Sequence, residues 1–232
     1  MSINQIRFRP LSWIKQLLIK KGRRPYKVRY GLYRGLTLNL NLQYETQLYL
    51  GLYERETYTT IRTAARACDW IIDIGAGKGE LCLYFLKNSC TQKVLAFEPD
   101  PEEIYIMQSN LTLNNKQNSR RISIFKKYVG TENNPNFISL DSLNLEKSKK
   151  GFIKIDVDGN ELDILESGKQ LLSYANIGLL IETHSRKLED KCLQWLKNKG
   201  YTYKIIPNAW WRFMLPEKRP IKHNRWLQAT KK

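Results

Sequence analysis

Apolar and polar positions alternate along most of the chain with two different periods. Short, mostly apolar runs such as WIIDIG, KVLAFE and IGLLIE indicate buried strands. Between them, KGELCLYFLKN and PEEIYIMQSNLTLNN place apolar residues three or four apart, which indicates amphipathic helices. Strands that alternate with helices predict right-handed crossovers and an α/β fold, in which helices cover both faces of a mostly parallel sheet.

Further elements complete this pattern. ISIFKKYV, NFISL, GFIKIDVDG and YTYKII are strand candidates, and NELDILESGKQLL and RKLEDKCLQWLKNKG are helix candidates. The C-terminal stretch AWWRFMLPEKRPIKHNRWLQATKK is expected to return across the sheet. There, His223, Asn224 and Trp226 are candidates for the mouth of a substrate site, although core packing is the favoured interpretation for the tryptophans. We expect residues 69–232 to form a single globular unit.

Residues 1–68 are expected to form a basic N-terminal extension that packs on this unit. Residues 26–42 alternate around Gly31 and Gly35, which predicts a β-hairpin, and residues 44–67 predict a helix. Residues 11–21, LSWIKQLLIKK, predict a short basic amphipathic helix that docks on the body or, as the alternative, lies on a membrane.

Composition narrows the class of protein. No apolar run approaches the roughly 20 residues that span a bilayer, and the N-terminal stretch lacks the apolar core of a signal peptide. The four cysteines, Cys68, Cys82, Cys90 and Cys192, form no CxxC pair. This favours free thiols in a reducing compartment over a zinc site. We expect a cytoplasmic protein, with peripheral attachment to a membrane as the alternative.

The net charge of +17 is concentrated at the two ends of the chain. Residues 1–34 contain ten Lys and Arg and no Asp or Glu, and residues 204–232 contain eight Lys and Arg and a single acid. Such ends suit nucleic acid, an anionic membrane surface or an anionic polymer. The alternative is that they only keep the protein soluble.

The segment DIGAGKG, residues 73–79, joins a strand to a helix and carries three glycines. Glycine lets the backbone turn tightly and lets a ligand approach a helix N-terminus. Asp73 ends its strand, where it can receive an ammonium group, and Glu98 ends the next strand, where it can accept hydrogen bonds from a ribose diol. Together they predict a pocket for S-adenosylmethionine. NAD is the weaker alternative, because dinucleotide binders have the longer GxGxxG spacing.

Six motifs then follow one another in order between about residue 70 and residue 184. They are DIGAGKGE, VLAFEPDP, NLTLNN, SLDSL, FIKIDVDGNELDILESG and LLIETHS, with LGLYERE and HNRWLQA as looser matches. This order resembles the FkbM family of S-adenosylmethionine-dependent methyltransferases. The resemblance implies a Rossmann-like class I methyltransferase fold with a mostly parallel seven-stranded sheet, and O-methylation of sugars, polysaccharides or natural-product hydroxyls. It places cofactor contacts at Asp73, Gly75, Ala76, Gly77, Glu98, Pro99 and Asp156. One departure is Lys78, since the family often has GANxG where this chain has GAGKG; its function is left open.

The strand-like run FIKIDVDGNE carries charges where a buried strand is usually apolar. Lys154 and Asp156 share one face, so Lys154 is expected to pair with a carboxylate. The strand is expected next to the glycine-loop strand, so Asp156 should face the transferred methyl group. Asp158 is better suited to cap the next helix, expected at residues 160–168, and Glu161 lies near by.

Glu182 and His184 end the following strand at the same edge of the sheet. Transfer of a methyl group to a hydroxyl usually needs a base, and histidine, with an ordinary pKa of about 6.5, suits proton transfer at neutral pH. We predict His184 or Asp156 as the base, with the other orienting substrate or cofactor. We assign no metal, although Asp156, Asp158 and His184 are an alternative set of ligands for a divalent ion.

The sequence therefore predicts an O-methyltransferase that acts on a hydroxylated small molecule or glycan. The first alternative is a ribose methyltransferase of RNA. The basic ends, interleaved with Trp210, Trp211 and Trp226, favour it, and Lys154, Asp156 and Glu182 resemble the Lys/Asp/Glu sets of such enzymes. A binding protein that has lost its chemistry is a third possibility.

Overall fold

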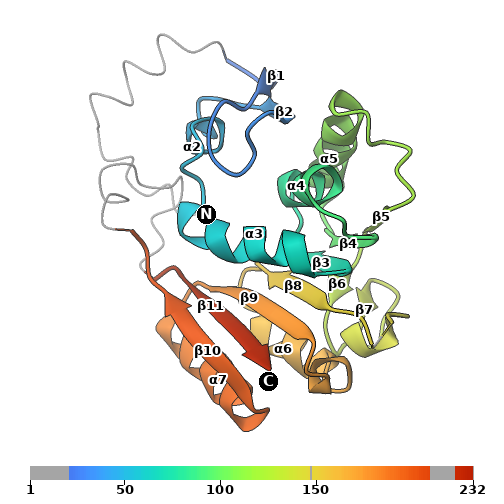
Figure 1. Ribbon diagram of the computed structural model, residues 1–232, viewed down its shortest axis with the longest axis vertical. Helices are drawn as coiled ribbons and strands as arrows, with labels where there is room; N and C mark the ends of the chain where they lie inside the picture. Colours follow the sequence, from blue (N-terminus) through green and yellow to red (C-terminus); the bar gives the residue numbers. More distant parts are fainter. Residues whose placement is uncertain (1–20, 147, 210–222, 232) are drawn as a thin grey trace.

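The structure is a computed structural model and describes residues 21–146, 148–209 and 223–231. Its centre is a seven-stranded sheet with the strand order β10-β11-β9-β8-β3-β4-β5 (Figure 1). The strand β11 runs antiparallel to both of its neighbours, and the other neighbouring strands are parallel. The predicted mostly parallel sheet of seven strands is thus confirmed. The strands are β3 (Trp70–Ile74), β4 (Lys93–Phe97), β5 (Ile122–Phe125), β8 (Gly151–Ile155), β9 (Ile177–Thr183), β10 (Tyr201–Ile206) and β11 (Arg225–Lys231).

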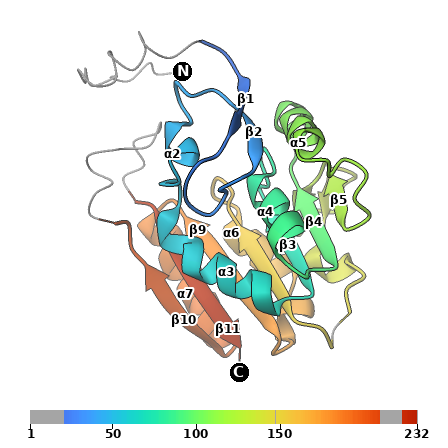
Figure 2. The ribbon, with the colours of Figure 1, turned by 45° about the horizontal axis from the view of Figure 1, so that its top comes forward.

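Helices cover both faces of this sheet (Figures 1 and 2). One face carries α3 (Tyr58–Ala67), α4 (Glu80–Asn88) and α5 (Pro101–Leu113), and the other carries α6 (Glu161–Ser167) and α7 (Arg186–Asn198). Each face of the sheet has its own hydrophobic core, and successive residues of a strand point to opposite faces. Ile71 packs in the core that contains residues of α3 and α4, and Ile72 packs in the core that contains residues of α6 and α7. Because both faces are buried, the strands read as continuous apolar runs.

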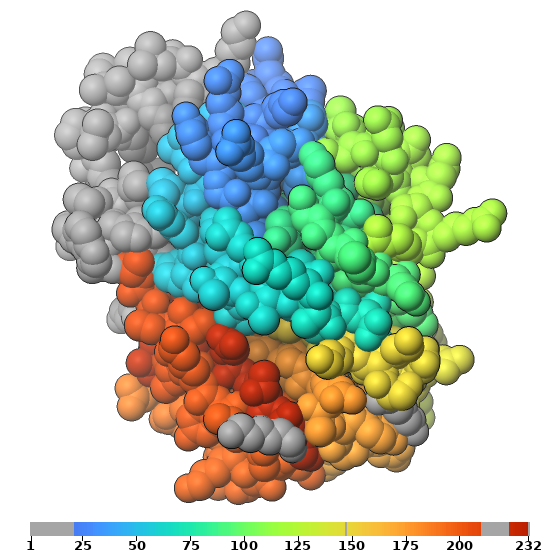
Figure 3. Space-filling model, viewed as in Figure 1, coloured from blue at the N-terminus to red at the C-terminus, as the bar shows by residue number. Residues whose placement is uncertain are grey.

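The N-terminal extension contains the predicted hairpin, formed by β1 (Arg24–Lys27) and β2 (Thr37–Leu40), which pair antiparallel. Its buried side chains Val28, Leu36 and Leu38 belong to the same core as α3 and α4. In the space-filling view, the blue N-terminal residues form one continuous surface with the cyan and green residues of these helices (Figure 3).

The prediction of one helix over residues 44–67 was wrong. The segment contains α2 (Thr46–Tyr49), a 3-10 turn (Arg55–Thr57) and α3. Between them Gly51 has φ +67° and Glu54 has φ +46°, both in the left-handed region that an α-helix excludes. A Cβ atom at Gly51 would lie 2.4 Å from the backbone nitrogen of Gly31, so the break brings this segment into backbone contact with the hairpin.

Other boundaries differ less. ISIFKKYV divides into β5 and β6 (Tyr128–Val129), and β6 pairs with β7 (Phe137–Ile138) outside the main sheet. The helix expected at residues 160–168 spans Glu161–Ser167, and the chain continues past Gly168 into a 3-10 turn (Leu171–Ser173). Trp226 lies fully buried in β11, as predicted. Trp210, Trp211 and all but the last residue of the predicted helix at 11–21 lie outside the described residues. None of the helices in the described part of the chain is long and apolar enough to cross a bilayer.

Candidate active site

The glycine loop, residues 75–79, connects β3 to α4 and packs against the end of β8. Gly75 and Gly79 have φ values of +76° and +74°. A Cβ atom at Gly75 would lie 1.9 Å from the carbonyl oxygen of Asp156, and one at Gly79 would lie 2.4 Å from Cγ of Met107. The two glycines therefore allow direct contact with β8 and α5, and this contact holds the loop beside Asp156.

Asp73 and Glu98 are buried at the ends of the neighbouring strands β3 and β4. Glu98 accepts hydrogen bonds from the backbone N–H groups of Gly77 at 2.8 Å and Asp100 at 2.9 Å. Asp73 Oδ2 accepts one from the Cys82 thiol at 3.3 Å, whereas Oδ1 is buried without a hydrogen-bond partner among the described residues.

Burial raises the pKa of Asp73 to about 6 and also raises the pKa of Glu98. A buried carboxylate oxygen without a partner is costly. The ammonium group of an amino-acid moiety would satisfy Oδ1 of Asp73, so the loop and its two carboxylates fit S-adenosylmethionine. Ala76 is buried and Pro99 is half-buried, each next in sequence to one of these groups.

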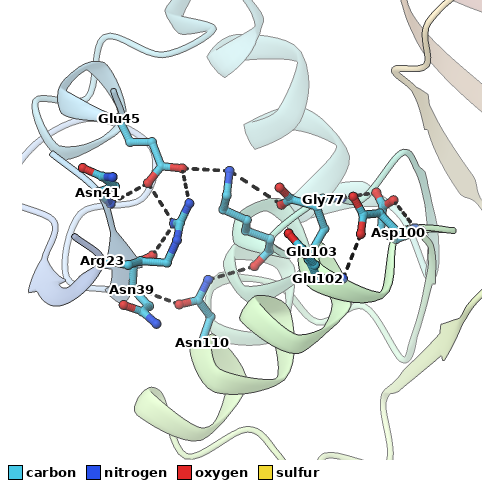
Figure 4. Close-up of polar contacts among 11 residues, drawn as sticks. Arg23, Asn39, Asn41, Glu45, Gly77, Asp100, Glu102, Glu103 and Asn110 are labelled. Atoms are coloured by element: carbon cyan, nitrogen blue, oxygen red, sulfur yellow. Dashed lines mark hydrogen bonds and ion pairs between the residues drawn. The ribbon is translucent and has the colours of Figure 1, made fainter. Parts of the chain in front are cut away.

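Lys78 connects the glycine loop to the N-terminal extension. Its Nζ lies 2.7 Å from Oε1 of Glu45 and 3.6 Å from Oε2 of Glu103. Arg23 donates two further hydrogen bonds to the Glu45 carboxylate, at 2.9 and 3.1 Å (Figure 4). Burial alone would raise the pKa of Glu45, but the contacts with Lys78, with the Asn41 N–H and with Arg23 lower it. Lys78 therefore has a structural partner in a segment that precedes the sheet.

Two asparagines of the NLTLNN motif fasten the same segment to α5. Asn110 accepts a hydrogen bond from the Asn39 N–H at 2.7 Å and donates one to the Lys78 carbonyl at 2.9 Å (Figure 4). Asn114 bonds both the N–H and the carbonyl of Thr37, at 3.0 and 2.6 Å. Their amide groups supply a donor and an acceptor to β2, as a neighbouring strand would.

A second polar cluster lies at the carboxyl ends of β8 and β9. Lys154 Nζ lies 2.8 Å from Oδ2 of Asp156, which confirms that Lys154 pairs with a carboxylate. His184 Nε2 lies 3.6 Å from the other oxygen of Asp156. Asp156, Glu182 and His184 present potential ligand atoms within 4.8 Å of one another. The alternative set of metal ligands predicted from the sequence contained Asp158. In the structure Asp158 is exposed, and Glu182 is the residue that lies with Asp156 and His184.

Glu54 is the residue of this cluster that we did not predict. It comes from the break between α2 and α3, is only 3% exposed, and places Oε2 3.4 Å from Lys154 Nζ. Its φ of +46° is unusual for a residue other than glycine. The sequence signal was weak: Glu54 lies in LGLYERE, one of the two looser matches to the family.

The charges of this cluster depend on one another. Burial opposes the charge of Asp156, but the Lys154 ammonium and the contact with His184 outweigh it and hold the pKa of the Asp156 carboxyl below its usual range. The contact with the Asp156 carboxylate in turn raises the pKa of His184. Burial, Asp156 and Glu54 raise the pKa of Glu182 well above its usual value. Asp156 is thus the ionised carboxylate, and Glu182 favours its protonated form.

Two buried groups in this region have polar atoms without a hydrogen-bond partner in the described part of the chain. Glu161, at the start of α6, is fully buried, and neither carboxylate oxygen has a hydrogen-bond partner among the described residues. Burial raises the pKa of Glu161 to about 7. Nδ1 of His184 is also buried without such a partner. Unpaired buried polar atoms mark a place where a proton or a bound group completes the site.

The remaining predicted residues lie elsewhere. His223 Nε2 lies 3.1 Å from Oε2 of Glu189 in α7 and takes no part in the Asp156 cluster. Asp158, which was expected to cap the helix α6, is not at its N-cap position; that position is Asn160, whose side chain makes no capping hydrogen bond. The structure therefore brings Gly75, Asp156 and His184 together with Glu54 and Lys154, at the edge where β3, β8 and β9 end.

Comparisons with known proteins bear on the fold and on the family that the chain resembles. Residues 114–203 match the methyltransferase FkbM domain. The FkbM methyltransferase structure from Methylobacillus flagellatus KT is 19% identical with a TM-score of 0.57, over 71% of this chain and 44% of that one. An S-adenosylmethionine-dependent O-methyltransferase from Thermotoga maritima is 15% identical with a TM-score of 0.54, over 77% and 65% of the two chains. An rRNA methylase from Streptococcus thermophilus is 13% identical with a TM-score of 0.53, over 77% and 98%.

The chain thus spans less than half the length of the Methylobacillus flagellatus protein. At these identities the likeness establishes the fold, a Rossmann-like class I methyltransferase fold. No curated protein matches the chain. Over residues 114–203 the chain therefore matches the methyltransferase FkbM domain, the family that its ordered motifs resemble.

Proposed function

We propose that this protein methylates a hydroxyl group of a sugar, a glycan or a natural-product-like acceptor. The observation that carries the proposal is the contact series His184–Asp156–Lys154 beside the glycine loop. When bound, S-adenosylmethionine supplies an electrophilic methyl group on a sulfonium. The chain itself then has to hold the acceptor hydroxyl close to that methyl group and take its proton.

His184 is the base in this proposal. Asp156 is the weaker candidate, because its lowered pKa makes it a poor proton acceptor and its two oxygens face Lys154 and His184. The contact with Asp156 orients the imidazole and stabilises its protonated form, which raises the pKa of His184. Nδ1 has no hydrogen-bond partner within residues 21–146, 148–209 and 223–231 and is the nitrogen left for the acceptor hydroxyl. The acceptor oxygen gives its proton to Nδ1 as it takes up the methyl group.

The cofactor contacts follow from the same edge of the sheet. Asp73 receives the ammonium on its unpartnered Oδ1, and Glu98 receives the ribose diol. The backbone of Gly75, Ala76 and Gly77 lines the proposed cofactor site, and Pro99 lies beside it at the end of the neighbouring strand. Because the Glu98 carboxylate accepts two backbone hydrogen bonds, the loop that surrounds the ribose is already organised.

Ribose methylation of RNA is the second candidate. Lys154, Asp156 and Glu182, the set that suggested it, lie in one cluster. The charge of +17 also favours a polyanionic acceptor. The two candidates share the chemistry of hydroxyl methylation and differ in the acceptor.

Incubation with methyl-labelled S-adenosylmethionine and cell extract, followed by separation into glycan, lipid, RNA and small molecules, tests the proposal. We expect the label in a saccharide or small-molecule fraction, and we expect His184→Ala and Asp156→Asn to abolish it. Label confined to RNA and removed by ribonuclease would favour the second candidate. Unchanged labelling by both variants would refute the assignment of the base.

A further inference from the structure

A groove with a cavity volume of about 710 Å³ lies beside the N-terminal hairpin. We call it the hairpin groove. It is lined by Tyr26, Lys27, Arg29, Arg34 and Tyr49, together with Pro25, Val28 and Gly35. A volume of this size is typical of a pocket for a small molecule. None of the residues in the site described above lines it.

The charge of the hairpin groove is entirely positive. Lys27, Arg29 and Arg34 are exposed, and within the described part of the chain none of them forms an ion pair with a carboxylate. The nearest acidic residue in the sequence, Glu45, is occupied by Arg23 and Lys78. A fourth cation reaches the same place, because Lys87 Nζ donates to the Gly35 carbonyl at 2.8 Å. An anion entering the groove therefore meets unneutralised donors.

The walls of the groove also carry aromatic surface. Tyr26 and Tyr49 are half-buried and pack edge to face, with ring centroids 6.0 Å apart and an interplanar angle of 72°. This arrangement offers no pair of parallel faces on which successive bases could stack, as single-stranded nucleic acid requires. It does offer an apolar ring face and phenol hydroxyls, which suit the C–H and hydroxyl groups of a sugar ring.

We propose that the hairpin groove binds an anionic saccharide, that is, a segment of a glycan carrying carboxylate, phosphate or sulfate groups. The guanidinium groups of Arg29 and Arg34 bind the anionic groups, and the tyrosines contact the sugar rings. Arg34 follows the buried Tyr33, whose ring packs edge to face on Tyr84 of α4 with ring centroids 6.4 Å apart, so the groove lies next to the helix that follows the glycine loop. The choice of a saccharide rests on the proposed function, whereas the anion site does not.

Binding can be measured without turnover, which separates this proposal from the methylation itself. A heparin-derived tetrasaccharide is titrated into the full chain by calorimetry, with maltotetraose as the neutral counterpart. We expect the charged probe to bind and the triple variant Lys27→Ala, Arg29→Ala, Arg34→Ala to weaken it at least tenfold. The matched variant Lys187→Ala, Lys191→Ala, Lys197→Ala removes the same charge from exposed positions on α7, at the opposite end of the molecule (Figure 1), and should bind as the wild type does.

Equal loss in both triple variants would show a non-specific charge effect and overturn the proposal, as would equal binding by the wild type and the hairpin variant. A uridine tetranucleotide or phosphatidylglycerol vesicles that bind more tightly than the tetrasaccharide, and lose binding in the hairpin variant only, would overturn it in favour of nucleic acid or membrane. Should the triple variant unfold early by circular dichroism, Arg34→Ala alone provides the measurement, with a smaller expected loss of about threefold.

Discussion

Glu54 of the N-terminal extension forms an ion pair with Lys154 in the central strand β8, with Oε2 and Nζ 3.4 Å apart. The same ammonium lies 2.8 Å from Asp156, so one buried cation joins a residue outside the sheet to the edge where the chemistry is proposed. Buried charges are tolerated only when they are paired in this way. The N-terminal extension is therefore part of the candidate active site.

Replacing Glu54 by Gln is expected to lower kcat about tenfold while leaving the affinity for S-adenosylmethionine within about twofold, because it releases Lys154 from one partner without touching the glycine loop. Steady-state kinetics and calorimetry test both values. Glu166→Gln, on the outer part of α6, is the control and should behave as the wild type does. A fall in cofactor affinity that matched the fall in kcat would contradict a positioning function for Glu54.

The contact between Glu45 and Lys78 is expected to support cofactor binding. Lys78→Met and Glu45→Gln should each weaken the binding of S-adenosylmethionine about fivefold, because the glycine loop loses its attachment to the hairpin. The double variant should be little worse than either single one, since both remove the same contact. Lys116→Met, in the turn that follows α5, is the control for charge. Fully additive losses would show that the two residues act independently.

Glu161 makes the stability of the fold depend on pH. Its folded pKa of about 7 lies above the ordinary value for glutamate, so the folded state binds more protons than the unfolded state between these values. Stability should therefore fall as pH rises from about 4.5 to about 7 and then level off. Glu161→Gln removes the cost of ionising this buried carboxyl group and should raise the free energy of unfolding at pH 8 by about 1–2 kcal/mol. Urea unfolding at pH 5 and pH 8 measures it; a variant less stable than the wild type at pH 8 would refute the assignment.

A His184 base predicts the form of the pH–rate profile. Only neutral imidazole accepts a proton, so kcat/KM for the acceptor should rise with pH through a value above the ordinary histidine pKa of about 6.5. His184→Ala should lose this rising limb of the profile and about 10²–10⁴ in kcat. A limb that stayed in place in His184→Ala would belong to another group.

Removal of divalent ions is expected to leave the activity unchanged. Asp156, Glu182 and His184 lie close enough to hold an ion, but Lys154 already neutralises Asp156, and an added cation would face that ammonium. The measurement is methyl transfer in EDTA, followed by addition of Mg²⁺ or Mn²⁺. Activity lost in EDTA and restored by the metal would replace the histidine base with a metal-bound hydroxyl.

Much of this site could be read from local sequence. The apolar runs predicted β3, β4, β8 and β9, and polar residues at the end of each run marked Asp73, Glu98, Asp156 and His184. Parallel strands present their carboxyl ends at one edge of a sheet, so residues that end different strands had to meet there. The spacing of the glycines in residues 75–79 predicted the tight turn between strand and helix.

The pairs that complete the site could not be read in this way. Glu54 and Lys154 are far apart in the sequence, and so are Glu45 and Lys78; neither pair belongs to a local pattern. The break at Gly51 and Glu54 was also missed, because it depends on the contact of Gly51 with Gly31 rather than on the propensity of the segment. The sequence by itself determined the alternation of elements and the residues at their ends, since these follow from periodic burial. Only the tertiary structure decided which charges neutralise one another, because ion pairing in a buried site depends on distances between segments that the order of residues does not contain.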